Sequence, residues 1–126
     1  DVPSTDQYGG NFSGPVSFSM LREAPDASVP DVALVHFRDG AATHWHAHPG
    51  GQLLWAVEGT GVVGTEQDGM VELAPGHLVE TPAGELHWHG AAPGSDAQLL
   101  ALTWGTTQWS QRPAPTSANE QSMGES

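Results

Sequence analysis

The chain has 126 residues, a formal net charge of −12 and no cysteine. This length suits a single domain, and the 15 acidic residues against three basic ones argue against nucleic-acid or membrane partners, because phosphates and anionic lipids need clustered cations. Without cysteine, catalysis has to rely on histidine, carboxylates or a metal. No stretch is as apolar as a bilayer span and no signal-peptide pattern is present, so we expect a cytoplasmic protein.

Short apolar segments separated by turns predict an all-β protein. The 16 glycines and 10 prolines fall mainly between these segments. The segments recur about every ten residues, which is typical of an antiparallel β-sandwich or barrel. We expect this domain over residues 15–110, after an N-terminal arm at 1–14 and before a flexible polar tail at 111–126. The predicted strands are residues 15–21, 32–37, 43–48, 52–59, 60–67, 70–74, 77–82, 86–92 and 97–104.

Two of these strands carry histidines at alternate positions. His44, His46 and His48 share one face of the strand at 43–48, and His87 and His89 repeat the pattern on the strand at 86–92. Imidazole is a common ligand of transition metals. Two such strands lining one cavity could hold a divalent metal ion, while the alternative is a solvated strand face with pH-sensitive side chains.

The spacing around the first pair resembles the first motif of the cupin family. That motif has a glycine, five residues, His-x-His, three or four residues, a glutamate, six residues and a glycine. Here Gly40, His46, His48, Gln52 and Gly59 fall in this frame, with glutamine in the place of glutamate.

The second cupin motif is matched in the same way. It has a glycine, five residues, Pro-x-Gly, two residues, a histidine, three residues and an asparagine. Gly76, Pro82, Gly84 and His87 match, and Ala91 stands in the place of the asparagine. The two motifs cover residues 40–91 without a gap, and the flanking strands extend the resemblance to about 15–105.

The resemblance implies a conical antiparallel β-sandwich or barrel of the jelly-roll type with one divalent transition metal ion inside. The implied ligands are His46, His48, Gln52 and His87, and the implied ion is manganese, iron or zinc, with nickel or cobalt as further candidates. An amide in place of a carboxylate leaves more positive charge on the metal, which makes it a stronger Lewis acid. Alternatively, Gln52 forms only hydrogen bonds inside the barrel and the metal has three ligands.

Two further histidines share a strand face with the implied ligands. His44 and His89 could each be an additional ligand, a general base or a residue at the rim. His44 is the better candidate for the acid/base, because alternation points it inward and the motif leaves its position free. His89 is interpreted as a rim residue or a support for the ligands, and we keep both as candidate catalytic residues.

Alternation also predicts the wall of the cavity. Its inward positions are mostly apolar, which suits a small aromatic or aliphatic carbonyl compound as substrate. These positions are Ala33, Val35, Phe37, Leu54, Leu99, Ala101 and Thr103. Trp45, Trp55 and Trp88 fall on the opposite face, where they would pack between sheets or against a second subunit.

Within the cupins, the sequence resembles the manganese-dependent hydroxynitrile lyases and the small polyketide cyclases. The resemblance implies a metal-dependent lyase or cyclase and a homodimer or higher homo-oligomer. The lyases have a further histidine on the late strand, where this chain has Leu99, Ala101 and Thr103. An iron-dependent dioxygenase and a non-catalytic ligand-binding cupin are the two alternatives.

Overall fold

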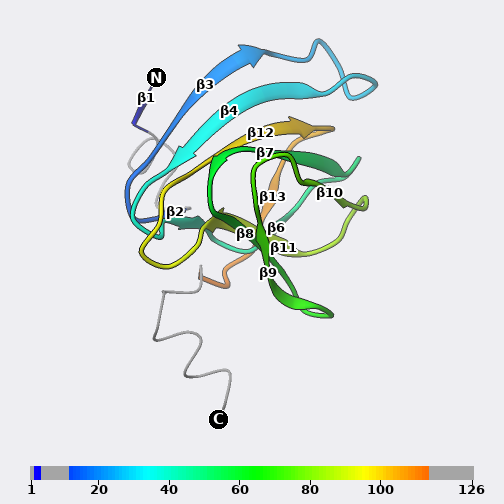
Figure 1. Cartoon of the computed structure of the whole chain (residues 1–126). Helices are drawn as coiled ribbons and strands as arrows, with labels where there is room; N and C mark the ends of the chain where they lie inside the picture. The colour runs from blue at the N-terminus through cyan, green and yellow to red at the C-terminus, as the bar shows by residue number, and fades with distance from the viewer. Residues whose placement is uncertain (1, 4–11, 114–126) are drawn as a thin grey trace.

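The computed structural model describes residues 2–3 and 12–113, which fold into β-strands joined by turns (Figure 1). This described part contains no helix long and apolar enough to cross a membrane. Its strands are β1 (Val2–Pro3), β2 (Phe12–Ser13), β3 (Val16–Arg22), β4 (Asp31–Phe37), β5 (Ala42–Thr43), β6 (His46–Ala47), β7 (Gln52–Gly59), β8 (Gly61–Thr65), β9 (Gly69–Leu73), β10 (Leu78–Thr81), β11 (His87–Ala91), β12 (Ala97–Thr103) and β13 (Gln108–Trp109).

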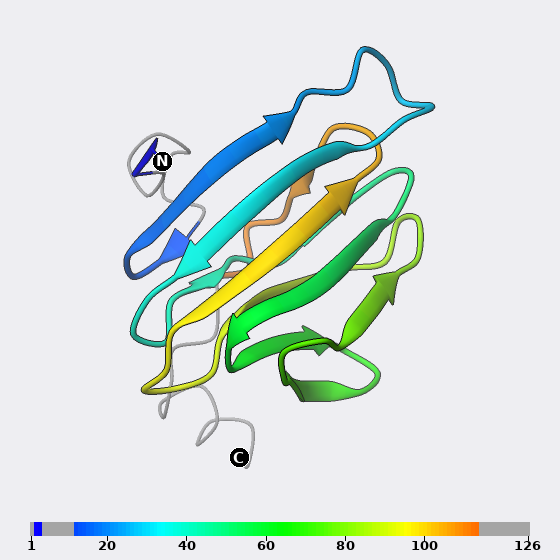
Figure 2. The same ribbon diagram turned by 45° about the horizontal axis from the view of Figure 1, so that its top comes forward.

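The strands form two antiparallel sheets. The first sheet has the order β1-β3-β4-β12-β7-β10, and the second has the order β13-β6-β11-β5-β2, with β8 paired to β11 and β9 paired to β8. Figure 2 shows the long strands β3, β4, β12 and β7 side by side in one curved sheet, with the short strand β10 next to β7 at its edge. The predicted all-β antiparallel sandwich is confirmed.

The main core lies between the two sheets. Period-two alternation on β12 buries Ala97, Leu99 and Ala101, while the residues between them are half-buried. Phe37 and Leu54, on the neighbouring strands β4 and β7, are fully buried in the same cluster. These side chains fix the relative position of the two sheets, and two of them, Phe37 and Ala101, also line the cavity described below.

A second apolar cluster packs on the other side of the histidine-bearing sheet. Trp45 and Trp88 are its large members, and both are buried. The Trp88 ring lies directly on Gly64, where a Cβ would be 2.0 Å from Nε1 of the indole, so any other residue at Gly64 would displace the ring. The guanidinium of Arg112 lies 3.8 Å from the Trp45 ring centre in a cation–π contact.

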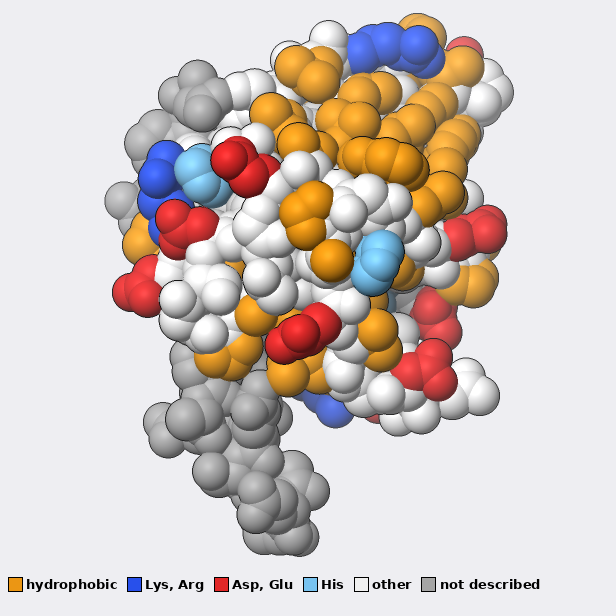
Figure 3. Space-filling model, viewed as in Figure 1, with side chains coloured by type: hydrophobic (Ala, Val, Ile, Leu, Met, Phe, Trp, Pro, Cys, Tyr) orange, Lys and Arg blue, Asp and Glu red, His pale blue; other side chains and the backbone are white. Residues whose placement is uncertain are grey.

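The first sheet carries apolar side chains on its outer face as well. Leu34, Leu100 and Trp55 are neighbours across β4, β12 and β7, and Trp55 is 42% exposed. Figure 3 shows hydrophobic side chains gathered over this sheet in the upper right of the view. We call this surface the outer apolar face and define it by Val32, Leu34, Leu53, Trp55, Val57, Leu78, Leu100 and Leu102.

The largest difference from the predicted strands lies at residues 43–48. This segment is interrupted at residues 44–45, so that β5 ends at Thr43 and β6 begins at His46. Two short strands that the sequence did not predict, β2 and β13, pair with β5 and β6. The predicted arm and tail fall largely on residues 4–11 and 114–126, which lie outside the described part of the chain.

Candidate metal centre and cavity

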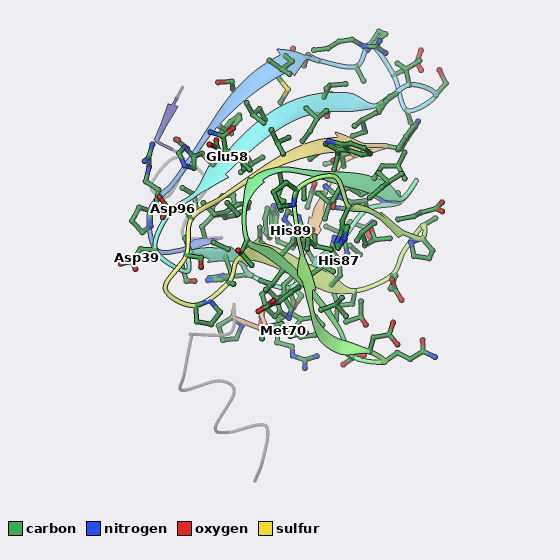
Figure 4. All side chains as sticks on the ribbon, viewed as in Figure 1. Asp39, Glu58, Met70, His87, His89 and Asp96 are labelled. Carbon is green, nitrogen blue, oxygen red and sulfur yellow. The ribbon has the colours of Figure 1, made fainter. Side chains whose placement is uncertain are left out.

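Four histidines from the second sheet meet in the interior. They are His46 on β6, His48 just after it, and His87 and His89 on β11. Their nitrogen ligand atoms lie within 4.8 Å of one another, and each residue is at most 4% exposed. His46 and His87 are direct cross-strand partners, and Figure 4 shows His87 and His89 in the interior of the sandwich. We call this group the histidine cluster.

Main-chain hydrogen bonds fix the orientation of two of these rings. Nδ1 of His46 lies 2.8 Å from the carbonyl oxygen of His44, and Nδ1 of His87 lies 3.0 Å from the carbonyl oxygen of Glu85. Because a carbonyl only accepts, each Nδ1 carries the proton and each Nε2 keeps its lone pair. This arrangement is typical of metal-binding histidines, whose second nitrogen donates to an outer partner. Nδ1 of His48 lies 3.1 Å from the hydroxyl of Thr107.

Gln52 presents its amide oxygen to the cluster. Its Nε2 donates a 2.8 Å hydrogen bond to Oγ1 of Thr103, the residue beside it on β12. Its Oε1 therefore points the other way, and it lies 3.2 Å from Nε2 of His87. The amide oxygen and the histidine nitrogens together form a neutral donor set of the kind that divalent transition metals accept.

Several nitrogens of the cluster have no hydrogen-bond partner among the described residues. They are Nε2 of His48 and both ring nitrogens of His89. A buried polar atom without a partner costs about 1–3 kcal/mol, and three within one cluster is unusual for a purely structural group. A metal ion in the cluster would provide the missing partner for an imidazole lone pair, so the residues present fit such an ion.

Burial lowers the pKa of every histidine in the cluster. Desolvation lowers the pKa of His46 to about 2 and that of His48 to about 4, and the nearby His87 contributes to both shifts. Desolvation likewise holds the pKa of His87 below its usual range and that of His89 well below it. Without a metal the rings are therefore neutral at pH 7, which is the form that binds a metal.

His44 is placed differently from the sequence expectation. It is half-buried, is not a member of the histidine cluster and does not line the cavity. The interruption between β5 and β6 ends the strict alternation on which the inward prediction relied, so that prediction is wrong. The contribution of His44 to the site is its main-chain carbonyl, which holds the His46 ring.

His89 also differs from its predicted place at the rim. It is 4% exposed, belongs to the histidine cluster and lines the cavity. Its ring meets the Phe37 ring edge-on at 5.8 Å between centroids. His89 is thus an interior residue at the boundary between the cluster and the apolar wall.

A cavity of about 290 Å³ opens beside the histidine cluster. Five of the predicted wall residues line it: Ala33, Val35, Phe37, Ala101 and Thr103. The other two, Leu54 and Leu99, are fully buried in the core instead. The wall residues that the sequence did not indicate are Phe12, Phe18, Met20, Asp31, Thr43, Thr106, Thr107 and Trp109.

The segment after β12 crosses from the first sheet to the second and closes one side of the cavity. It forms β13, which pairs with β6 and brings the Trp109 ring to 4.7 Å from the His46 ring. Trp109 also meets the ring of Phe12 edge-on at 5.9 Å. The cavity therefore has an aromatic wall next to the histidine cluster.

The orientation of Gln52 gives a testable prediction. Replacing Thr103 with valine removes the acceptor for Gln52 Nε2, so the amide can turn away, and we expect metal affinity to fall about 10- to 100-fold. Thr103→Ser should restore it, and Thr106→Val, which removes a cavity hydroxyl not bonded to Gln52, should leave it unchanged. Competition titration with a metal-sensitive dye measures this. Equal affinities in all three variants would mean that Gln52 is not a ligand.

Comparison with known proteins now places the chain. A family model for the cupin domain matches residues 33–104, more than half of the sequence. The chain belongs to the cupin family. The expected resemblance is thereby confirmed, and the histidine cluster lies on the two cupin motifs. Outside these motifs, the cupin match includes Ala33, Val35 and Phe37 on β4 and Ala101 and Thr103 on β12, which line the cavity.

Three relatives of this cupin are informative. An (R)-mandelonitrile lyase from Granulicella tundricola is 42% identical over 91 residues, covering 72% of this chain and 70% of that protein. A cupin-like protein from Thermotoga maritima has a TM-score of 0.78 at 32% identity, over 88% of this chain and 86% of that one. The polyketide cyclase RemF from Streptomyces resistomycificus has a TM-score of 0.62 at 18% identity, over 88% and 79%, and shows the shared fold alone.

Proposed function

We propose that this cupin is a metal-dependent carbon–carbon lyase that cleaves the cyanohydrin of a small apolar aldehyde into the aldehyde and hydrogen cyanide. The observation that carries the proposal is the unequal environment of the four histidines. Three have a hydrogen bond at Nδ1, whereas neither ring nitrogen of His89 has a hydrogen-bond partner among the described residues, and His89 borders the cavity. The 42% identity to an (R)-mandelonitrile lyase supports the same class of reaction.

Three histidines and one amide are suited to hold the metal. His46, His48 and His87 lie with ring centroids 4.4 to 5.1 Å apart, and each has a hydrogen bond at Nδ1 that leaves Nε2 for the metal. The amide oxygen of Gln52 completes the set. When bound, a divalent ion supplies Lewis acidity that stabilises negative charge on the substrate oxygen.

His89 is suited to carry the proton. Its ring lies 5.1 Å from that of His46 and 5.7 Å from that of His87, centroid to centroid, and no hydrogen bond from the described residues occupies either of its nitrogens. As a neutral imidazole it can accept the hydroxyl proton of the cyanohydrin. The carbon–carbon electron pair then leaves with cyanide, which takes up a proton from the imidazolium to give hydrogen cyanide.

Thr43 and the cavity wall complete the arrangement. The hydroxyl of Thr43 accepts a 3.1 Å hydrogen bond from the main-chain N–H of His89 and borders the cavity, so its own proton is directed to a bound substrate or to a neighbouring acceptor. The walls formed by Phe18, Val35 and Ala101 exclude water and contact an apolar substituent. Exclusion of water also strengthens the electrostatic interactions at the reacting oxygen.

The proposal is tested by cyanide release. Protein reconstituted separately with manganese, zinc and ferrous iron is incubated with racemic mandelonitrile, and cyanide and benzaldehyde are measured against a metal-free control. We expect cyanide above the spontaneous rate with redox-inert zinc or with manganese, under anaerobic conditions as well. Oxygen uptake that requires ferrous iron would favour a dioxygenase instead, and full metal content without turnover on any substrate would favour a binding protein.

The division of roles among the histidines gives a second prediction. In His89→Phe we expect turnover to fall about 10²- to 10⁴-fold, the usual range for loss of a general base, with stoichiometric metal retained. Elemental analysis after gel filtration measures the metal. His77→Phe makes the same change at an exposed histidine outside the cavity and should behave as the wild type. Loss of metal in His89→Phe would instead make His89 a fourth ligand.

We also propose that two copies of this cupin associate through the outer apolar face. The eight residues of the face carry no charge on a chain of net charge −12. The nearest charged side chains are Arg22, the cross-strand partner of Val32, and Glu80, the partner of Leu53, at opposite edges of the face. Two copies can therefore bury the apolar centre without burying like charges. The eight residues lie on the four strands β4, β12, β7 and β10. At about 4.8 Å between strands and about 3.3 Å per residue over seven residues, they cover a flat area of about 19 Å by 23 Å. The side chains that project from the sheet make its accessible area larger than this flat area, toward the roughly 800 Å² that each partner contributes to a standard interface.

The assembly proposal has a matched pair of variants. Val57 on the outer apolar face is 42% exposed, and Val71 on β9, in the other sheet, is 46% exposed. We expect Val57→Glu to raise the dimer dissociation constant at least about tenfold, because the substitution buries a charge, and Val71→Glu to have no effect. Sedimentation equilibrium measures both. A monomeric wild-type protein, or equal effects of the two variants, would contradict the proposal.

A further inference from the structure

The cavity wall contains a single acidic residue among the described residues that line it. This is Asp31, the first residue of β4. It continues the inward-facing series of Ala33, Val35 and Phe37, all of which line the cavity. A carboxylate at the end of an apolar wall is costly unless it has hydrogen-bond donors, so its environment indicates what the cavity accepts.

The strand register places Asp31 at a defined distance from the histidine cluster. Asp31 is the cross-strand partner of Thr103 on β12, and Thr103 is the partner of Gln52 on β7. Two strand spacings separate the backbones of Asp31 and Gln52 by about 9.6 Å. Because all three side chains border the same cavity, a ligand with one end at the cluster can place its other end against Asp31.

The hydrogen bonds of Asp31 leave acceptor capacity on the cavity side. Its Oδ1 accepts a 2.6 Å hydrogen bond from the main-chain N–H of Ala24, which holds the carboxylate in place. Within the described part of the chain no hydrogen bond reaches Oδ2. An ionised carboxylate accepts at about four positions, so most of this capacity is available to a bound molecule.

We propose that Asp31 is a specificity-determining residue that binds a hydrogen-bond donor, above all a hydroxyl group, at the end of the substrate opposite the reacting carbon. The inference rests on the proposed function for the identity of the reacting end. It narrows the substrate to an aromatic carbonyl compound, or its cyanohydrin, with a hydroxyl at the far side of the ring. A purely apolar ring would offer no donor to Oδ2 of Asp31 on the cavity side and would bind more weakly.

The alternative is that Asp31 serves only to hold the loop before β4 through its bond to Ala24. Asp31→Asn distinguishes the two, because the amide oxygen still accepts the hydrogen bond from the Ala24 N–H. The amide group lacks the negative charge and offers its N–H₂ to the cavity. The loop is therefore preserved while the preference for a donor is removed.

The test compares two aldehydes of similar size. Isothermal titration of metal-loaded protein with 4-hydroxybenzaldehyde and with 4-methylbenzaldehyde gives two dissociation constants without any need for turnover. The chain has no lysine, so no lysine side chain can form an imine with either aldehyde. Wild-type protein should bind the hydroxyl compound about tenfold more tightly, since hydrogen bonds to charged groups are strong.

The variants decide the result. In Asp31→Asn the preference should fall to about twofold or less, while Asp68→Asn, which makes the same change in the exposed β8–β9 turn, should keep it. Absence of a preference in the wild type, an unchanged preference in Asp31→Asn, or no binding of either aldehyde overturns the proposal. A preference that depends on Asp31 without cyanide release would support this inference and refute the lyase function.

Discussion

Replacement of His46 by alanine is expected to remove the metal and with it the lyase activity. His46 is 1% exposed and its ring lies within 5.1 Å, centroid to centroid, of each of the other three histidine rings. Losing this central ligand should lower metal occupancy at least about tenfold and kcat/KM roughly 10³-fold. Elemental analysis and cyanide release measure the two effects on the same preparation.

The controls separate loss of the site from loss of the fold. His36→Ala makes the same change on β4 at a half-buried histidine that is not in the cluster, and it should keep both metal and activity. The melting temperature of metal-free His46→Ala should lie within a few degrees of that of the metal-free wild type. Full metal content in a folded His46→Ala protein would refute the ligand assignment.

The metal-free protein is expected to lose stability steeply as the pH falls below 6.5. The pKa of His46 is lowered to about 2 and that of His48 to about 4, and the pKa of His89 lies well below 6.5, whereas in the unfolded chain all three titrate near 6.5. At pH 5 the unfolded chain therefore binds more protons than the folded protein. By linkage, the free energy of unfolding falls as the pH falls.

The size of this effect follows from the number of histidines. Each histidine that is protonated only in the unfolded chain contributes a slope of about 1.4 kcal/mol per pH unit, so three approach about 4 kcal/mol per unit well below pH 6.5. This contribution is complete above pH 6.5 and is lost toward acid. Since domains have about 5–15 kcal/mol of stability in total, we expect extensive unfolding near pH 5.

Urea unfolding of the chelator-treated protein at pH 7.5, 6 and 5 measures this dependence. Metal-free His89→Phe should show a slope smaller by about one histidine's share. An unchanged free energy of unfolding between pH 7.5 and 5 would show that the cluster accepts protons while folded. Metal-loaded protein should release its ion over the same range, because protons and metal compete for the imidazole nitrogens.

Local periodicity was sufficient for the fold class and for the centre of the site. The alternating apolar residues of β7 and β12 predicted strands of nearly the observed length. The spacing of His46, His48 and His87 matched the cupin motifs, and the structure brings these three side chains together. The alternation of residues and the spacing of the cupin motifs predicted the same three histidines, because each of them lies on or beside a regular strand.

Periodicity failed where the strand is interrupted and where contacts are distant in the sequence. The break at residues 44–45 placed His44 outside the cluster, and alternation alone could not indicate it. Leu54 and Leu99 do point inward, but at a depth where the core fills the space between the sheets. Alternation of residues predicts which face of a strand a side chain is on, but it does not predict how far along the strand the cavity ends and the core begins.

The missed wall residues have two different origins. Phe18 and Met20 belong to β3, a predicted strand whose inward face could have been assigned from the same alternation. Thr107 and Trp109 follow β12 and reach the cavity only through pairing of β13 with β6. That pairing joins residues more than 60 positions apart, so no local signal could indicate it.

The carbonyls of residues 44 and 85 that hold the His46 and His87 rings have an implication for the history of this site. Each comes from the position two residues before its histidine, and every amino acid provides the same carbonyl. Substitutions at these two positions therefore leave the orientation of the His46 and His87 rings unchanged. Homologous lineages are free to place different chemistry there, and a library randomised at both positions should retain metal binding in most of its members.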